Sequence, residues 1–305
     1  MIAIVGPTAV GKTAVAIELT ALIGGEIVSA DSMAIYKGMD IGTAKPTAEE
    51  QLRARFHLID VADPAESFNV GEFQRLAHDA IDDISHRNPP AIIVGGSGLY
   101  VRAAIDGLDE SIPADNKEFR QRMVEQARLY GNEYVHGMLA KVDPVSAQRI
   151  HPNNLKRVIR ALEIYDLTGS RPSDVFEKDS RRESRYPDAR FFGLTMDRKM
   201  LYARVEDRVD MMIDTGLVEE VSRLICSGID PDTTAMQGLG YKEIAGYLRG
   251  EYGFDKAVEL LKKNTRRFAK RQYTWFRADP RVQWIDVEGR TAAEVSLIIK
   301  ESLDK

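Results

Sequence analysis

The feature that most constrains the fold is a glycine-rich segment near the start of the chain, which matches the pattern G-x-x-x-x-G-K-[ST] at every position. This segment consists of Gly6, Pro7, Thr8, Ala9, Val10, Gly11, Lys12 and Thr13. The apolar run Ile2–Val5 before it predicts a buried strand, and residues 13–23 after it predict a helix. A strand, a loop and a helix in this order are typical of a phosphate-binding loop, so we expect these eight residues to bind a diphosphate.

The residue types of this loop suit a diphosphate for separate reasons. Gly6 and Gly11 allow backbone N–H groups to turn inward, and the N-terminus of the following helix favours negative charge. Lys12 supplies a positive charge, and the Thr13 hydroxyl is a ligand for a bound Mg²⁺. We therefore expect an α/β, P-loop NTPase-like fold, a parallel sheet flanked by helices, with Mg²⁺ as the cofactor.

A carboxylate follows the second expected strand. Residues 26–31 predict a strand that ends at Asp31. Ligands of open α/β sheets bind at the carboxyl ends of the strands, so Asp31 lies near the phosphate loop if the first two strands are neighbours. The alternative is a turn or capping aspartate before Ser32.

A glycine-rich turn follows a further buried strand, which residues 91–94 predict. It consists of Gly95, Gly96, Ser97 and Gly98. ATPases of this class usually carry an acidic residue at such a strand end, so the departure argues against motor-type and switch-type enzymes. The glycines either form a simple turn or, as we expect, allow a ligand to approach closely while Ser97 hydrogen-bonds it.

Other segments complete the expected core. Residues 56–60 predict a strand in which His57 suits a structural role better than a catalytic one. Thr-Ala-Glu-Glu from Thr47 and Asn-Val-Gly-Glu from Asn69 predict capping boxes at the starts of two helices. Residues 191–194 resume the sheet, and helices are predicted for residues 201–213, 218–226 and 255–276.

Between residues 111 and 185 the pattern changes from strands to helices. The expected helices span residues 118–129, 133–139, 144–150 and 155–167. We therefore expect an α/β core of residues 1–110 and 186–305, and an inserted all-helical domain of residues 111–185.

The insertion carries several basic residues. Lys156, Arg157 and Arg160 recur at helical spacing and share one face, for which a merely solvated face is the alternative to a binding one. A mobile loop is expected to contain Arg171, Arg181, Arg182 and Arg185.

The last long helix carries a concentrated basic patch, although the net charge of the chain is −5. Its basic residues, with no acidic residue among them, are Lys262, Lys263, Arg266, Arg267, Lys270, Arg271 and Arg277. Its interleaved aromatic residues are Phe268, Tyr273, Trp275 and Phe276. Such a patch suits a polyanion backbone. The alternative is a surface helix whose arginines pair with nearby acids.

The composition narrows the classes further. A chain of 305 residues, of which 44% are hydrophobic, can bury a sizeable core. Cys226 is the only cysteine, which excludes disulfides within the chain and cysteine-based zinc sites. The first strand leaves no room for a signal peptide, and no apolar run approaches the ~20 residues of a membrane helix, so we expect a cytoplasmic protein. Because no heptad run demands association, we expect a monomer.

These groups suit the displacement of a phosphate or diphosphate. Asp31 would take a proton from the acceptor, while Lys12 and arginines of the insertion would neutralise the leaving group. A small-molecule kinase fits this much. The basic helices favour instead an acceptor carried on nucleic acid.

Eight sequence blocks carry a resemblance that extends from the phosphate loop to Trp284. They are GPTAVGKT (6–13), ADSMAIYKGMDIGTAKP (30–46), FHLID (56–60), SFNVGEFQ (67–74), VGGSGLY (94–100), KRVIRALEIY (156–165), GLGYKE (238–243) and TRRFAKRQYTWFR (265–277). In these blocks the chain resembles the tRNA dimethylallyltransferases, bacterial enzymes that prenylate an adenosine beside the anticodon. The last block and the DIGTAKP run are far more specific than the phosphate loop.

The resemblance implies transfer of the dimethylallyl group from dimethylallyl diphosphate to N6 of the adenosine at tRNA position 37, on the 3′ side of the anticodon. The products are N6-isopentenyladenosine and diphosphate. The implied partners are dimethylallyl diphosphate and the anticodon stem-loop of tRNA, with no membrane. Asp31 would remove the amine proton, and the adenine must be extruded from the RNA to reach the pocket.

The resemblance also implies roles for individual residues. The implied catalytic residues are Asp31, Lys12, Thr13 and Ser97. The diphosphate would be bound by residues 6–13 with Arg160 and with Arg208, which is carried over from the DRVDMM context alone. The RNA would be contacted by Asp31, Ser32, Met33, Ala34, Ser97, Lys156, Arg157, Arg160, Gly240, Tyr241, Lys242, Lys270 and Arg271.

Three positions depart from the family pattern. Ser97 replaces a threonine and keeps the hydroxyl, and Asn154 replaces an aspartate that caps a helix, a role asparagine also fills. Ala34 stands where glutamine is frequent, which removes an amide able to read the target base.

Two alternatives remain beside the prenyltransferase. The first is an ATP-dependent small-molecule kinase, which has no need of a basic patch of seven residues. The second is a non-catalytic tRNA-binding protein with an inactive phosphate loop, which the intact Lys12, Thr13 and Asp31 disfavour.

Overall fold

The computed structural model describes residues 1–109, 116–180 and 182–304. The chain divides into two compact units, Met1–Ile105 with Tyr186–Lys305, and Asp106–Arg185. Position 111, where the sequence places the first domain boundary, and Arg181 lie outside the described residues.

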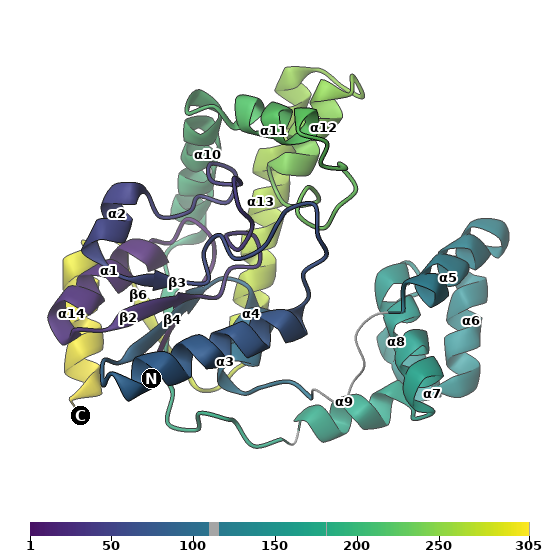
Figure 1. Ribbon diagram of the computed structural model, residues 1–305, viewed down its shortest axis with the longest axis horizontal. Helices are drawn as coiled ribbons and strands as arrows, with labels where there is room; N and C mark the ends of the chain where they lie inside the picture. The colour runs from purple at the N-terminus through teal and green to yellow at the C-terminus, as the bar shows by residue number, and fades with distance from the viewer. Residues whose placement is uncertain (110–115, 181, 305) are drawn as a thin grey trace. The chain divides into compact units, whose positions relative to one another are not determined.

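The first unit is built on a parallel sheet of six strands (Figure 1). The strands are β1 (Ile2–Val5), β2 (Glu26–Ser29), β3 (Phe56–His57), β4 (Ala91–Gly95), β5 (Arg190–Thr195) and β6 (Val282–Asp286). Their spatial order is β3-β2-β4-β1-β5-β6, and each neighbouring pair is parallel. All carboxyl ends therefore meet at one edge, where this type of sheet binds its ligands.

Helices cover the sheet on both faces (Figure 1). The helices of this unit are α1 (Lys12–Ile23), α2 (Ala48–Arg53), α3 (Val70–His86), α4 (Gly98–Ile105), α10 (Arg198–Asp214), α11 (Leu217–Cys226), α12 (Tyr241–Leu248), α13 (Phe254–Arg277) and α14 (Ala292–Leu303). Of these, α11 packs on α10 and α12, and α12 packs on α13. Leu19 of α1 and Ile299 of α14 share a buried core with Ile4 and Ile92 of the central strands. Because side chains alternate along a strand, the neighbouring residues face the other side, where α3 and α4 pack on β4.

Local sequence signals set several helix starts as expected. The capping boxes at Thr47 and Asn69 are both formed, with each side-chain acceptor bonded to the N–H three residues on and the glutamate bonded back. Asn154 begins a helix without a side-chain cap hydrogen bond, so the expected capping role is wrong.

The second unit has a helical core of its own. Its helices are α5 (Lys117–Tyr130), α6 (Asn132–Val142), α7 (Pro144–Arg149), α8 (Leu155–Thr168) and α9 (Pro172–Ser180). Val135, Leu139 and Val158 are fully buried in a shared apolar cluster. The loop expected for residues 171–185 is wrong where α9 forms. The proline at the first position of α9 favours a helix start. The helix was missed because the segment is short and lacks clear apolar periodicity.

Other expectations about the core need correction. The strand expected at residues 56–60 is limited to β3, because Leu58 and Asp60 have left-handed φ angles of 62° and 56° that break the extended chain. The sequence reasoning also missed β6 and α14, which complete one edge and one face of the sheet. Within the described part of the chain, every helix is too short or too polar to span a lipid bilayer.

A buried ion cluster fixes the end of the sheet away from the phosphate loop. Glu26, at the start of β2, accepts from both terminal nitrogens of Arg87 and lies 2.7 Å from His57 Nε2. The hydrogen bond from Arg87 and a weaker one from His57 outweigh burial and lower the pKa of Glu26 to about 2. His57 therefore has the structural role expected for it.

This cluster predicts a pH-dependent contribution to stability. The lowered pKa of Glu26 contributes fully to the stability of the folded protein above pH 4.5, the ordinary pKa of glutamate. This stabilisation is lost as the pH falls toward about 2. We expect Glu26→Gln to lower the free energy of unfolding by about 2–3 kcal/mol at pH 7, with the difference from the parent shrinking below pH 4.5. Urea denaturation of both proteins at several pH values measures this, with Glu66→Gln on the surface as control. Equal unfolding free energies at neutral pH would contradict it.

Candidate active site

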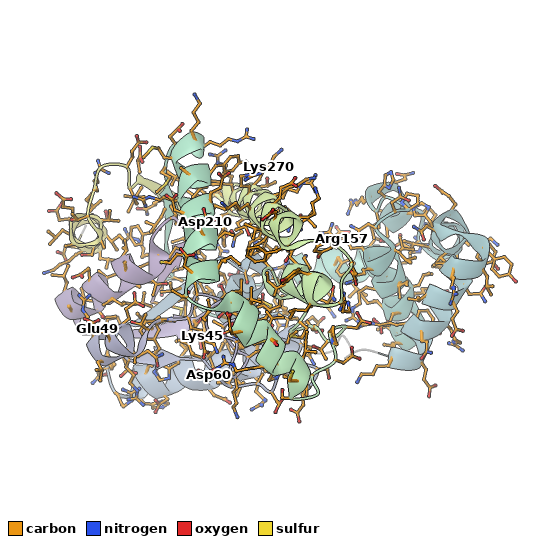
Figure 2. All side chains as sticks on the ribbon, turned by 90° about the horizontal axis from the view of Figure 1, so that it is seen from above. Lys45, Glu49, Asp60, Arg157, Asp210 and Lys270 are labelled. Atoms are coloured by element: carbon orange, nitrogen blue, oxygen red, sulfur yellow. The ribbon has the colours of Figure 1, made fainter. Side chains whose placement is uncertain are left out.

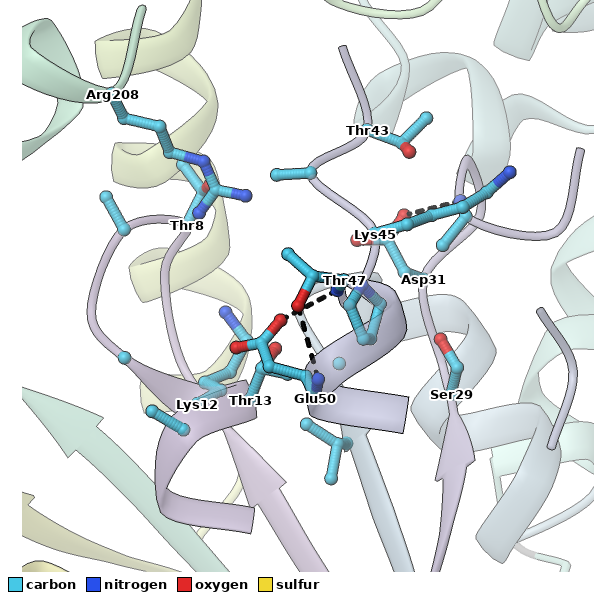
Figure 3. A pocket seen from close by; sticks show the side chains of 18 of the residues that line it. Thr8, Lys12, Thr13, Ser29, Asp31, Thr43, Lys45, Thr47, Glu50 and Arg208 are labelled. Atoms are coloured by element: carbon cyan, nitrogen blue, oxygen red, sulfur yellow. Dashed lines mark hydrogen bonds between the residues drawn. The ribbon is translucent and has the colours of Figure 1, made fainter. Parts of the chain in front are cut away.

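A cavity of about 880 Å³ lies around the phosphate loop at the carboxyl edge of the sheet (Figure 3). The expected site residues that line it are Thr8, Ala9, Gly11, Lys12, Thr13, Asp31, Ala34 and Arg208. The segment 43–50 forms another part of its wall, and α10 and α13 contribute side chains. The structure thus brings together the loop, the carboxylate and one arginine that sequence reasoning named separately.

The phosphate loop has the backbone geometry that anion binding needs. Gly6 has φ 141° and packs so closely on β5 that a Cβ atom would meet the Leu194 oxygen at 2.7 Å. Gly11 has φ 101° and begins α1, whose N-terminus carries no capping side chain. Its first N–H groups therefore point into the pocket edge as donors for a ligand.

Two half-buried cations, Lys12 and Arg208, lie beside this loop. Burial lowers the pKa of Lys12 to about 7, with Asp31 opposing and Arg208 adding to the shift. Burial likewise lowers the pKa of Arg208, against the attraction of Asp31 and Glu50. Among the described residues, the buried Nε of Arg208 has no hydrogen-bond partner, while Lys12 Nζ donates to Pro7 O at 2.7 Å. A bound anion would satisfy the arginine and favour the charged form of the lysine.

Asp31 lies at the pocket as expected, but the strand order that places it there differs from the expected one. The first two strands are not neighbours, because β4 lies between β1 and β2. Asp31 nevertheless lines the pocket two residues beyond the end of β2. Its Oδ1 accepts the Met33 N–H at 2.8 Å and the Ala34 N–H at 3.4 Å. The residue is therefore both the turn aspartate of the alternative interpretation and a carboxylate of the pocket.

The glycines at the end of β4 make room for other parts of the protein, and Gly95 also lines the pocket, so the close approach of a ligand stays a prediction. A Cβ atom on Gly95 would lie 2.1 Å from the Ala30 oxygen, and one on Gly98 would lie 2.2 Å from the Trp275 indole. Ser97 is not among the residues that line the pocket; its Oγ accepts the Ser32 N–H at 3.1 Å and bonds the Ser32 hydroxyl. Ser97 thus supports the turn beside Asp31.

Gln272 on α13 is a site residue that sequence reasoning missed. Its Oε1 accepts the Thr8 N–H at 2.8 Å, and its Nε2 donates to Gly96 O at 3.0 Å. The side chain is buried and joins the phosphate loop to the end of β4. A single uncharged polar residue on the buried face of a basic helix was the available signal.

Some basic residues of α13 pair with nearby acids, as in a surface helix, and others are exposed, as in a patch that binds a polyanion. Lys262 pairs with Asp210 of α10 at 2.6 Å, and Arg266 pairs with Glu206, as a surface helix would. Lys270 and Arg271 are exposed (Figure 2 labels Lys270 and Asp210). The other exposed basic residues of the patch are Lys263, Arg267 and Arg277. The exposed set forms the part of the helix available to a polyanion.

The expected RNA contacts at the start of α12 need correction. Gly240 is buried, and Tyr241 is 0% exposed with its hydroxyl bonded to Glu220 at 2.6 Å. Neither presents a side chain to a partner. Lys242 is half-exposed beside Glu243, and Met33 packs against Gly238.

The insertion presents its basic residues on one side of α8. Lys156 and Arg157 are exposed, while Val158 and Ile159 are buried, as the spacing predicts. Arg160 pairs with the buried carboxylate of Glu163 at 2.6 Å, so part of its charge serves the fold of the insertion.

Comparisons with known proteins show the family to which the chain belongs. Residues 34–279 match the family model described as IPP transferase. The tRNA dimethylallyltransferase of Desulforudis audaxviator is 50% identical over 297 residues, which cover 94% of this chain and 92% of that one. The chain belongs to this family. That of Carboxydothermus hydrogenoformans is 49% identical over 94% of this chain and 91% of its own length.

Solved structures of the IPP transferase family show the same fold. The tRNA isopentenylpyrophosphate transferase of Bacillus halodurans is 44% identical, covers 99% of this chain and 96% of its own, and gives a TM-score of 0.73. The structure of a eukaryotic dimethylallyltransferase acting on tRNA is 27% identical in sequence. It covers 100% of this chain and 79% of its own, and it gives a TM-score of 0.83. As a member of this family, the chain is a prenyltransferase enzyme, and these relatives give no support to the kinase alternative.

The burial of the Arg208 charge predicts that this residue lowers the stability of the free protein but strengthens the binding of diphosphate. Arg208→Met removes a desolvated charge, so we expect it to be at least as stable as the parent without ligand. It also removes a charge-assisted contact worth about 1.5–3 kcal/mol, so inorganic diphosphate should bind about 10- to 100-fold more weakly. Thermal unfolding with and without diphosphate measures both effects, with Lys199→Met, an exposed cation of α10, as control. A parent-like diphosphate shift in the Arg208 variant would refute the assignment.

Proposed function

We propose that this chain transfers the dimethylallyl group of dimethylallyl diphosphate to N6 of the adenosine on the 3′ side of the anticodon in tRNA. The observation that carries the proposal is the pocket of this family member, which two half-buried cations with lowered pKa values, the phosphate loop and Asp31 line together. The tRNA substrate of the relatives supports a cytoplasmic location. Because no heptad run in the sequence demands association, we propose that the enzyme acts as a monomer.

The pocket suits each end of the substitution. The bond between the allylic carbon and the diphosphate oxygen breaks, and its electron pair leaves with the diphosphate. Lys12, Arg208 and the N-terminus of α1 stabilise that charge. The adenine N6 forms the new bond to carbon and gives its proton to Asp31, whose carboxylate is held by the turn 31–34.

Thr13 supports the proposal of a bound Mg²⁺. Its side chain lines the pocket beside Lys12. Mg²⁺ is usually held by one or two protein groups together with substrate phosphates and water, so one hydroxyl next to a diphosphate site fits. The ion would neutralise part of the diphosphate charge.

The RNA would be held outside the pocket by the exposed cations. Lys270 and Arg271 of α13 and Lys156 and Arg157 of α8 are all exposed. The target base would leave the anticodon loop at a cost of a few kcal/mol, lower there than in a duplex. Ser32 and Ala34, on the turn after Asp31, would then meet it.

Asp31→Asn tests the assigned base. The amide keeps the shape of the turn but cannot accept the N6 proton, so we expect transfer to fall by about 10²- to 10⁴-fold. Labelled dimethylallyl diphosphate, Mg²⁺ and an anticodon stem-loop give the rate, and binding of inorganic diphosphate and of RNA should change little. Near-normal turnover would show that Asp31 is not the base. A parent that labels no RNA but turns over ATP on a small acceptor would overturn the proposed function.

Lys270→Ala and Arg271→Ala test the RNA surface. Each exposed cation that contacts a phosphate releases counterions, so each variant should weaken RNA binding and flatten the slope of log K against log salt by up to about 1. Binding titrations at several salt concentrations measure the slope, while affinity for dimethylallyl diphosphate should stay the same. Lys300→Ala on α14 is the matched control. An unchanged slope in both variants would exclude this patch.

A further inference from the structure

One wall of the pocket is a segment without regular structure. Thr43, Ala44, Lys45, Pro46 and Thr47 line the cavity between β2 and α2. Figure 3 shows Thr43 and Lys45 across the cavity from Lys12 and Thr13. No strand pairing holds these five residues, so other contacts must fix their position.

A buried carboxylate holds the start of this segment. Glu220 of α11 is 1% exposed and accepts hydrogen bonds from three successive backbone N–H groups. Its Oε2 lies 2.9 Å from the nitrogens of both Asp40 and Ile41, and its Oε1 lies 3.1 Å from that of Gly42. Successive N–H groups that converge in this way form an anion-binding concavity, which here is filled by the protein's own carboxylate.

Tyr241 of α12 completes this contact. Its hydroxyl donates to Glu220 Oε1 at 2.6 Å. Its ring lies directly under Gly42, where a Cβ atom would meet ring carbons at 2.6–2.7 Å. Two helices therefore hold one turn from two sides, and both Glu220 and Tyr241 are too buried to contact a macromolecular partner. We call Glu220 and Tyr241 the clamp.

The turn held by the clamp continues directly into the wall. Thr43 Oγ1 donates to Met39 O at 2.6 Å, and the Ala44 N–H donates to Ile41 O at 3.0 Å. The Lys45 N–H donates to Asp40 O at 3.1 Å, and its ammonium bonds Asp40 Oδ1 at 2.7 Å. A shift of the turn would therefore move the wall.

We propose that Glu220 and Tyr241 are positioning residues for the transfer reaction, which set the wall 43–47 against the phosphate loop. The proposal rests on the proposed function. The clamp touches neither the loop 6–13 nor Asp31 through any of these contacts, so diphosphate binding is separable from it. Displacing a pocket wall by about 1 Å disturbs the alignment of the reacting atoms, and misalignment of this size lowers a reaction rate by up to about 10²-fold.

Glu220→Gln is the main test. Either orientation of the amide turns an NH₂ group toward two donors, so the contact cannot re-form in full. We expect kcat for transfer to a stem-loop to fall about 10- to 100-fold per folded molecule, while inorganic diphosphate and RNA bind within about twofold of the parent. Tyr241→Phe keeps the ring under Gly42 but loses one donor, so its kcat should fall less. Glu219→Gln, the exposed neighbour on α11, is the matched control and should behave like the parent.

The outcomes separate the two proposals. If the parent transfers label and both clamp variants keep a parent-like kcat per folded molecule, with only a lower melting temperature, the clamp is structural and the positioning role is wrong. If Glu220→Gln fails to fold, Tyr241→Phe decides: a reduced kcat with unchanged diphosphate affinity supports the role, and a parent-like kcat overturns it. If the parent transfers no label, the proposed function fails and the positioning role fails with it.

Discussion

Two cations share one buried pocket, and the rest of the site follows from that constraint. Lys12 and Arg208 both have lowered pKa values because burial removes their hydration, and Arg208 further disfavours the charge of Lys12. Asp31 offsets part of this cost for both cations, and Glu50 offsets part of it for Arg208, but the pKa of each cation still stays lowered. Buried charge without a partner is strongly unfavourable, so the free protein holds a site whose electrostatics a multiply charged anion completes. A departing diphosphate is such an anion at the moment of reaction.

Helix α13 connects that pocket to the surface because its faces differ in chemistry. Gln272 turns inward and bridges the Thr8 N–H and Gly96 O, which fixes the phosphate loop against the end of β4. Lys270 and Arg271, on neighbouring positions, are exposed. A helix of 24 residues packed on the sheet is rigid enough to relate the two faces. An RNA backbone bound at Lys270 and Arg271, as proposed, would thereby have its position related to that of a leaving group in the pocket.

Sequence reasoning found the parts of the fold that local signals determine. The phosphate loop, both capping boxes and the long helices depend on residues within a few positions of one another, and each formed. The strand order did not follow, because nothing local shows that β4 inserts between β1 and β2. The packing role of the glycines at the end of β4 was missed for the same reason, since the groups they accommodate, such as Trp275, are distant in sequence. Asp31 was found despite a wrong premise, because all parallel strands end at one edge.

The difference between local signals and contacts distant in sequence also explains what the resemblance to a family showed and what it missed. It included the runs DIGTAKP and GLGYKE among its blocks but assigned Gly240 and Tyr241 to RNA. In the structure the two blocks contact each other: Tyr241 lies under Gly42, and Glu220, from outside both, bonds each. A glycine is required at position 42 because the ring leaves no room for a side chain, and a tyrosine at 241 because its hydroxyl meets a buried carboxylate. Specific sequence in these blocks therefore reflects the packing that shapes the pocket wall, a constraint as strict as contact with a substrate.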